Sequence, residues 1–154
     1  MILAFDPGIR TLSWAVATSR GIEEAGSVDL LQGQPKTKHK QYAFLVWQFV
    51  KKHRRLFKKA KLIVIEAQMS AKMKQVQVAL QCLGDISKTV IVPPIRWRRF
   101  HNISHGSYKL NKKASVQMVQ SMALPENVRT VLASKKKKDD ICESILLGLY
   151  ALTL

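Results

Sequence analysis

Apolar and β-branched residues near the start of the chain fall into three short runs that turn residues separate. The first run, residues 1–5, stops at Asp6, and a proline and a glycine follow it as turn signals. Similar runs cover residues 12–18 and the region near 22–31. Consecutive strands joined by short turns pair side by side. The pattern therefore predicts three antiparallel strands, with Asp6 at the carboxyl end of the first.

Helical spacing of apolar side chains then runs from residue 38 to residue 59 and predicts one long helix. His53 lies on its apolar stripe, where we expect a histidine packed in or beside the core rather than a ligand. The run at 62–65 is wholly apolar and β-branched, as in a central strand covered on both faces, and it ends in Glu66. A right-handed crossover can place this strand beside the first one. We therefore expect Glu66 to lie near Asp6.

A second long helix is predicted over residues 71–87, and a fifth strand follows it at 89–92. This helix has two apolar stripes, which can serve two surfaces. One would pack on the sheet and the other against a second copy, so we expect a homodimer through residues 69–87; burial of both stripes is the alternative. The first stripe contains Met69, Met73, Val76, Leu80 and Leu83, and the second contains Ala79, Cys82 and Ile86.

The last third of the chain predicts a loop at 102–110 and helices at 112–122, 126–132 and 139–154. The final helix is apolar on nearly every side, as a buried helix is. With 154 residues, 47% hydrophobic residues and a mean hydropathy of −0.06, the chain suits one globular domain over residues 1–154.

Charge and cysteine content narrow the partners and the compartment. Lys and Arg number 26 against 10 Asp and Glu, a net charge of +16, which favours a polyanion, nucleic acid first, over a merely soluble basic surface. The two cysteines, Cys82 and Cys142, form no zinc motif and predict buried free thiols. With no signal-peptide layout and no membrane-spanning run, we expect a soluble, intracellular protein in a reducing compartment.

Candidate nucleic-acid contacts are the cations that lie in loops, at helix starts or among aromatic side chains. The segment from Arg96 to His101 interleaves cations with Trp97 and Phe100, which suits phosphate contact with base or sugar stacking, although such aromatics also anchor cores. The expected DNA contacts are Arg10, Lys72, Lys74, Arg96, Arg98, Arg99, Lys109, Lys112, Lys136 and Lys137.

Four of the ten acids occupy positions where burial penalises a carboxylate. Asp6 and Glu66 end apolar strands, while Asp140 and Glu143 lie one helical turn apart at the start of the buried last helix. Simpler accounts exist, because a helix start favours acids and Glu66 can cap a backbone or pair with a lysine. A bound hard divalent metal ion, Mg²⁺ or Mn²⁺, would explain why all four carboxylates occupy such positions. Two such ions about 4 Å apart can hydrolyse phosphodiesters.

Three acidic blocks in this order resemble the RuvC-like Holliday junction resolvases of the RNase H-like superfamily. The layout is most similar to the compact resolvases of poxviruses and other large DNA viruses, and to those of fungal mitochondria. The resemblance spans nearly the whole chain. It rests on Phe5-Asp6-Pro7-Gly8-Ile9-Arg10 with residues 12–17, on Ile63-Val64-Ile65-Glu66, and on Lys138-Asp139-Asp140-Ile141-Cys142-Glu143-Ser144.

The resemblance implies an α/β fold with a five-stranded mixed sheet and helices on both faces. It also implies a homodimer that makes paired symmetric nicks in four-way junction DNA with magnesium, in the host cytoplasm if the source is a virus. The basic residue that the family places near the scissile phosphate matches Lys113 best, with Lys109 and Lys112 as alternatives. The family often has Asp where this chain has Glu143, so Asp139 is a possible substitute ligand. The implied metal ligands are Asp6, Glu66, Asp140 and Glu143.

Three other functions compete with junction resolution. Another RNase H-like nuclease, acting on RNA–DNA hybrids or as a transposase, would share the acidic set. An actin- or sugar-kinase-like nucleotide-binding module would share the Asp6-x-Gly8 turn with Thr11, but it needs a second phosphate loop and a longer chain. A non-catalytic protein that binds DNA junctions is the third alternative.

Overall fold

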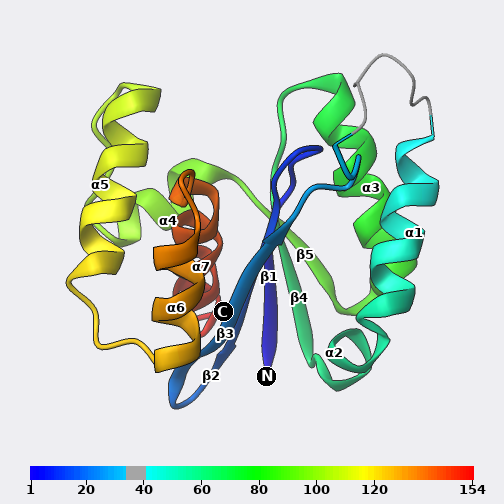
Figure 1. Ribbon diagram of the computed structural model, residues 1–154, viewed down its shortest axis with the longest axis horizontal. Coiled ribbons are helices and arrows are strands. Elements are labelled where there is room, and N and C mark those ends of the chain that lie inside the picture. The colour runs from blue at the N-terminus through cyan, green and yellow to red at the C-terminus, as the bar shows by residue number, and fades with distance from the viewer. Residues whose placement is uncertain (34–40) are drawn as a thin grey trace.

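A mixed five-stranded sheet forms the centre of the protein in the computed structural model, which describes residues 1–33 and 41–154 (Figure 1). The strands lie in the order β3-β2-β1-β4-β5. The pairs β3–β2 and β2–β1 are antiparallel, and the pairs β1–β4 and β4–β5 are parallel. This confirms the expected α/β fold. The strands are β1 (Ile2–Asp6), β2 (Leu12–Thr18), β3 (Gly21–Val28), β4 (Leu62–Glu66) and β5 (Thr89–Val92).

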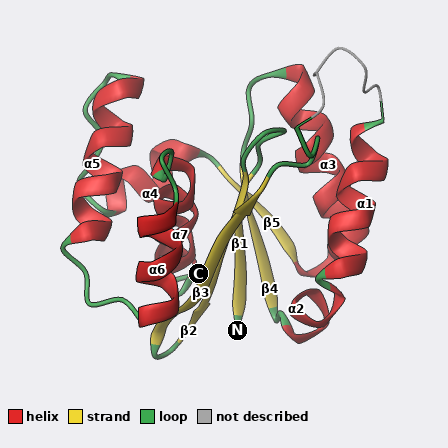
Figure 2. Ribbon diagram, in the orientation of Figure 1, coloured by secondary structure: helices red, strands yellow, loops and turns green. Residues whose placement is uncertain are grey.

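Helices cover both faces of the sheet, as Figure 2 shows. One group consists of α1 (Tyr42–Lys52), α2 (Arg54–Lys59) and α3 (Ala71–Gly84). The other face is covered by α4 (Pro94–Phe100), α5 (Tyr108–Gln120), α6 (Glu126–Ser134) and α7 (Asp139–Ala151).

The central strands β1 and β4 are buried on both faces, since their successive side chains point into two separate cores. Leu3 and Ile63 belong to the core under α1 and α3. Ala4 and Val64 belong to the core under α7. The small side chain of Ala4 lets α7 approach closely, and a Cβ added at Gly148 of α7 would lie 3.5 Å from the Ala4 Cβ. Helix α7 is therefore packed closely against the central strand β1.

The single helix expected over residues 38–59 is two helices. It breaks at His53, whose backbone N–H closes α1 on the Phe49 carbonyl at 3.0 Å. The bend lets both Phe49 and Phe57 pack on Phe5, with ring centroids 6.1 and 5.6 Å away. His53 lies at the core boundary against the Phe49 ring at 4.5 Å, as expected of a packing histidine. Residues 38–40 lie outside the described part of the chain.

Other boundaries shift by a few residues. Helix α5 begins at Tyr108 instead of residue 112, because the Ser107 hydroxyl caps it by accepting a hydrogen bond from the Leu110 N–H at 3.5 Å. Helix α3 ends at Gly84, and a short 3-10 turn, η2 (Ile86–Lys88), replaces the last turn that the sequence predicted. Helix α7 ends at Ala151.

Each predicted stripe of α3 has both buried and exposed members. Val76 and Leu80 of the first stripe and Ala79 of the second are buried, whereas Leu83 of the first and Cys82 and Ile86 of the second are exposed. The expectation of two buried thiols is therefore wrong for Cys82, which lies on the side of α3 that faces away from the sheet. Cys142 is buried, and neither thiol forms a disulfide. Within the described residues, no helix is both long and apolar enough to cross a membrane.

Candidate active site

The two central strands deliver Asp6 and Glu66 to the same edge of the sheet, where β1 and β4 end side by side (Figure 1). The turn after β1 is tight: a Cβ on Gly8 would lie 2.4 Å from the Thr11 carbonyl oxygen, so only glycine fits there without a shift. The chain can thus leave the strand directly beyond Asp6 and keep its carboxylate on the sheet edge.

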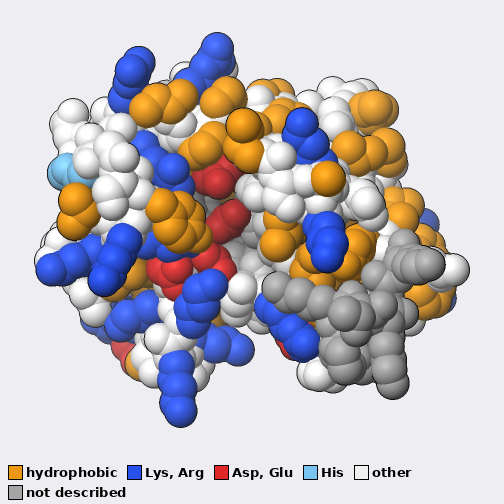
Figure 3. Space-filling model, turned by 90° about the horizontal axis from the view of Figure 1, so that it is seen from above, with side chains coloured by type: hydrophobic (Ala, Val, Ile, Leu, Met, Phe, Trp, Pro, Cys, Tyr) orange, Lys and Arg blue, Asp and Glu red, His pale blue; other side chains and the backbone are white. Residues whose placement is uncertain are grey.

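Helix α7 adds the other two acids to this edge. Asp140 lies in its first turn and Glu143 directly after that turn, and together with Asp6 they can place one carboxylate oxygen each within 4.8 Å of one another. Figure 3 shows acidic side chains at the bottom of a hollow, with Lys and Arg side chains around them. The cavity has a volume of about 310 Å³, and Asp6, Glu66, Asp140 and Glu143 line it.

Burial and mutual repulsion change the protonation of two of these acids. Burial, reinforced by the charges of Glu66 and Glu143, raises the pKa of Asp6 well above its ordinary value. Burial next to Glu143 likewise raises the pKa of Glu66 to about 7. Among the described residues, Asp6 accepts no hydrogen bond and forms no ion pair. Its carboxylate is the least compensated charge in the site.

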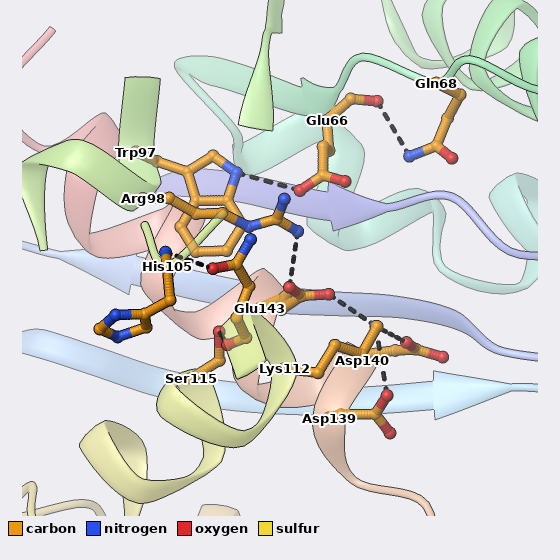
Figure 4. A network of polar contacts seen from close by, with 11 residues as sticks. Glu66, Gln68, Trp97, Arg98, His105, Lys112, Ser115, Asp139, Asp140 and Glu143 are labelled. Atoms are coloured by element: carbon orange, nitrogen blue, oxygen red, sulfur yellow. Dashed lines mark hydrogen bonds and ion pairs between the residues drawn. The ribbon is translucent and has the colours of Figure 1, made fainter. Parts of the chain in front are cut away.

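Lys112 of α5 partly balances the acids of α7, as Figure 4 shows. Its Nζ donates to Glu143 Oε2 at 2.6 Å, lies 3.2 Å from Asp139 Oδ2, and also donates to Asp140 Oδ1. Burial alone would lower the pKa of Lys112, but the charges of Glu143, Asp6 and Asp140 outweigh it and hold this pKa above its usual range. Burial would raise the pKa of Asp140, and Lys112 reverses that shift.

The start of α5 is fixed by buried polar groups, which keep Lys112 in place (Figure 4). The Asn111 side chain accepts a hydrogen bond from the His105 N–H at 2.7 Å, and the Ser115 hydroxyl donates to the Asn111 carbonyl at 3.0 Å. Asn111 and Ser115 are both buried. The position of Lys112 beside the acids is therefore set by the fixed start of the helix as well as by its own side-chain contacts.

Helix α4 supports the site from the other side. The indole of Trp97, which is completely buried, donates to Glu66 Oε2 at 3.0 Å, and the Arg98 guanidinium donates to Glu143 Oε1 at 2.7 Å. The Gln68 side chain adds a long bond to the Glu66 carbonyl at 3.4 Å. Trp97 and Arg98 thus orient one carboxylate each.

A protein-family model described as "Poxvirus A22 protein" matches residues 1–153 of the chain. The chain belongs to this family. The match confirms the resemblance to resolvases of poxviruses and other large DNA viruses. No curated protein matches the sequence closely enough to count as a relative.

Solved structures with this fold include several resolvases. The Fowlpox virus resolvase, in complex with substrate Holliday junction DNA, is similar with a TM-score of 0.71 and 18% identity over 99% of this chain and 96% of that one. The yeast mitochondrial Holliday junction resolvase Ydc2 has a TM-score of 0.68 and 18% identity, over 96% of this chain and 76% of that one. Thermus thermophilus RuvC has a TM-score of 0.54 and 11% sequence identity, over 99% of this chain and 95% of that one. The RuvC-like, RNase H-like fold of this A22-family chain is thereby confirmed.

The structure brings all four predicted metal ligands of the A22-family chain to one cavity, and it differs from the sequence prediction at the basic residue. Lys112 lies among the acids, whereas Lys113 is exposed and makes no ion pair within the described residues. Lys109 is also exposed. Asp139 contacts Lys112 but is not part of the group of close carboxylate oxygens.

The predicted DNA contacts separate into three groups. Arg98 and Lys112 are largely buried and pair with the acids, so they are less available to DNA than expected. Arg10 and Lys137 line the cavity and pair with Asp29 at 2.8 Å and with Asp140 at 3.4 Å. The remaining six are exposed: Lys72, Lys74, Arg96, Arg99, Lys109 and Lys136.

Sequence reasoning missed the contact between Trp97 and Glu66. It treated the tryptophan as a candidate for stacking on a base, which its complete burial excludes. The available signal was Pro93-Pro94, since a proline at a helix start predicts a short helix directly after β5. Such a helix would turn residue 97 back toward the end of β4.

Proposed function

We propose that this A22-family protein is a structure-specific endodeoxyribonuclease that resolves four-way DNA junctions by paired, symmetric, metal-dependent nicks. The observation that carries the proposal is the buried set of Asp6, Asp140 and Glu143, with Glu66 beside it, in a cavity that basic residues surround. The similar Fowlpox virus resolvase is described with Holliday junction DNA as its substrate. We assign the activity to the resolution of recombination intermediates and replication concatemers.

The donor set suits a hard divalent cation, and we propose Mg²⁺, replaceable by Mn²⁺, with two ions per site. Lys112, Arg98 and the more exposed Lys137 compensate only part of the charge that the four carboxylates carry when ionised. Asp6 accepts no hydrogen bond and forms no ion pair among the described residues, and like charges help to raise its pKa. Carboxylate oxygens are the ligands that Mg²⁺ prefers. A bound divalent ion would act as a Lewis acid and would lower the pKa of a bound water.

The residues of the chain have distinct tasks in this proposal. Asp6, Glu66, Asp140 and Glu143 hold the metal, and Trp97 and Arg98 orient two of them. The Lys112 ammonium stabilises negative charge that develops on the scissile phosphate, because among the cations that line the cavity it contacts the most acids, Asp139, Asp140 and Glu143. This replaces the assignment of Lys113. Burial strengthens each of these interactions by excluding water.

Exposed cations around the cavity would hold the junction arms through phosphate contacts. Arg10 and Lys137 lie in the cavity lining, Arg96 and Arg99 are exposed on α4, Lys109 is exposed on α5, and Lys136 is exposed just before α7. Such binding weakens steeply as salt rises, since each phosphate contact releases counterions.

We also propose that the nicks are paired because the protein is a homodimer through α3. An apolar groove of about 830 Å³ lies between α1 and α3, lined on α3 by Val78, Cys82 and Leu83. On α1, the rings of Phe44 and Trp47 stack 5.6 Å apart and are largely exposed. Exposed apolar surface of this kind marks an interface. The groove contains Leu83 of the first predicted stripe and Cys82 of the second, and it lies on the helix predicted to dimerise.

The proposal is tested with a synthetic four-way junction, a linear duplex and an RNA–DNA hybrid of matching sequence, each incubated with the protein and Mg²⁺. Cleavage confined to the junction, and abolished by a chelator, is the expected result. Cleavage of the hybrid alone would assign the protein to a ribonuclease-H-type activity. Junction binding without cleavage in Mg²⁺ and Mn²⁺ would leave a DNA-binding protein.

A further inference from the structure

A second concentration of positive charge lies at the end of the molecule away from the acids. Six exposed cations follow one another where α1 meets α2; we call this surface the α1–α2 corner, and it consists of Lys51, Lys52, Arg54, Arg55, Lys58 and Lys59. In Figure 1, α2 lies at the opposite end of β1 and β4 from the edge that carries Asp6 and Glu66.

A backbone contact fixes this separation. The Lys61 N–H, just after α2, donates to the Met1 carbonyl at 3.0 Å, so the corner adjoins the amino end of β1. Asp6 is the last residue of β1 and lies five positions after Met1, about 16 Å away at the usual rise of a strand. The corner is therefore a surface separate from the cavity of the acids.

The charges of the corner are not neutralised within the described part of the chain. None of the six forms an ion pair there, whereas Arg20 and Arg129 at other exposed positions pair with Glu23 and Glu126. A cavity of about 550 Å³ opens among the corner residues, and its lining includes one acid, Glu24, together with Trp14. A neighbouring cavity that includes Lys51, Arg54 and Lys58 contains a second acid, Asp85, which pairs with Lys88. Most of the positive charge of the corner therefore faces solvent without an acidic partner.

Helix stability does not account for this arrangement. Lys51, Lys52, Lys58 and Lys59 lie in the last turns of their helices, where the macrodipole favours cations. Arg54 and Arg55 instead begin α2, where the macrodipole opposes positive charge. Six neighbouring cations also repel one another. A bound polyanion would relieve both costs.

We propose that the α1–α2 corner binds the phosphate backbone of a second DNA duplex while the acidic cavity holds the junction. This inference rests on the proposed function, which supplies a junction for the cavity. Exposed, flexible lysines and arginines suit a phosphate backbone, which needs charge and no base-specific contact. The apolar side chain that α2 buries most, Phe57, points into the core, so α2 offers little apolar surface to a membrane. One protein would thus hold two DNA segments together.

The test is a two-step capture. Protein is bound to a bead-linked four-way junction in a chelator, which prevents metal-dependent cleavage, and the beads are washed before a labelled linear duplex is added. The corner variant is Arg55→Glu/Lys59→Glu, on one side of α2. The matched control is Arg20→Glu/Arg129→Glu, which makes the same change in charge at exposed positions elsewhere. A parallel assay measures nicking of the free junction in Mg²⁺.

We expect the wild-type protein and the control to capture the duplex and the corner variant to capture about tenfold less, because phosphate contacts dominate such binding. All three proteins should nick the junction at similar rates. Equal capture by both variants, or no capture by the wild-type protein, would overturn the inference. Absence of nicking by the wild-type protein with capture intact would overturn the proposed function instead.

Discussion

Lys112 Nζ lies 2.6 Å from Glu143 Oε2, which joins α5 to α7 at the centre of the acidic cavity. The same ammonium also contacts Asp139 and Asp140. Lys112 therefore contacts all three acids of α7, which Arg98 and Lys137 help to balance, while Asp6 on β1 accepts no hydrogen bond and forms no ion pair among the described residues. This division makes Lys112 the central basic group of the site and Asp6 its least compensated acid.

Replacing Lys112 separates its role from that of its neighbour. We expect Lys112→Met to lower the rate of junction nicking about 10²- to 10³-fold, as loss of a charge-stabilising donor does. Lys113→Met, which removes an exposed lysine, should leave the rate unchanged. Single-turnover nicking at saturating metal measures both. Because Lys112→Met leaves buried acids unpaired, Lys112→Arg serves as a second variant that retains the positive charge. An equal loss of nicking rate in Lys112→Met and Lys113→Met would contradict the assignment.

Glu66 should make the metal-free protein less stable as pH rises. Its pKa is raised to about 7 by burial and by Glu143, so the folded state binds more protons than the unfolded state between the ordinary carboxyl pKa and about pH 7. The free energy of unfolding therefore falls through this window. Glu66→Gln removes the penalty, and we expect it to stabilise the protein at pH 8 by on the order of 1–3 kcal/mol.

Denaturant unfolding in a chelator at pH 5 and pH 8 tests the effect of Glu66→Gln. The gain should be small at pH 5, where the carboxyl of the parent protein is largely protonated, and full at pH 8. A gain that is the same at both pH values would show that Glu66 is not the group responsible.

Trp97 should influence the metal without touching it. Trp97→Phe keeps a buried ring but removes the N–H that donates to Glu66 Oε2 at 3.0 Å. Partners that orient metal ligands typically change metal affinity or activity 10- to 100-fold, so we expect half-maximal nicking to need about that much more Mg²⁺. A Mg²⁺ titration measures this, with Trp14→Phe, which contacts none of the acids, as the control. An unchanged titration would mean that Glu66 is oriented without the indole.

The α3 interface is tested by placing a charge in the apolar groove. We expect Val78→Glu to convert a dimer into a monomer in light scattering and to replace paired nicks by slow single ones. Val90→Glu makes the same substitution at a half-exposed position on β5 and should leave the dimer intact. A Val78→Glu protein that remains dimeric would require another interface.

Most of the framework of the site could be predicted from the sequence, because it depends on strand ends. The apolar runs that stop at Asp6 and Glu66 placed both acids, and the apolar last helix placed Asp140 and Glu143 close together near its start. The positions of these four acids follow from the periodicity of apolar residues, so they can be predicted without knowing how any side chain is oriented.

The basic residue could not be predicted in the same way. Its position depends on the rotation of α5, which buried Asn111 and Ser115 determine, and such polar residues do not look like core residues in a sequence. Lys113 lies two positions after Asn111, about 200° around the helix, and so it faces solvent. The break at His53 was hidden for a similar reason, since it depends on the packing of two distant phenylalanines on Phe5.

Comparison of the wild-type protein with Asp6→Asn on a strand-labelled four-way junction tests the central claim most directly. The substitution removes one carboxylate charge from the cavity and leaves its cations unchanged. We expect the wild-type protein to make paired nicks at symmetric positions in opposing strands, and Asp6→Asn to bind the junction equally well without cutting it. Nicking that survives in Asp6→Asn, or loss of binding together with nicking, would contradict the role of the acidic site.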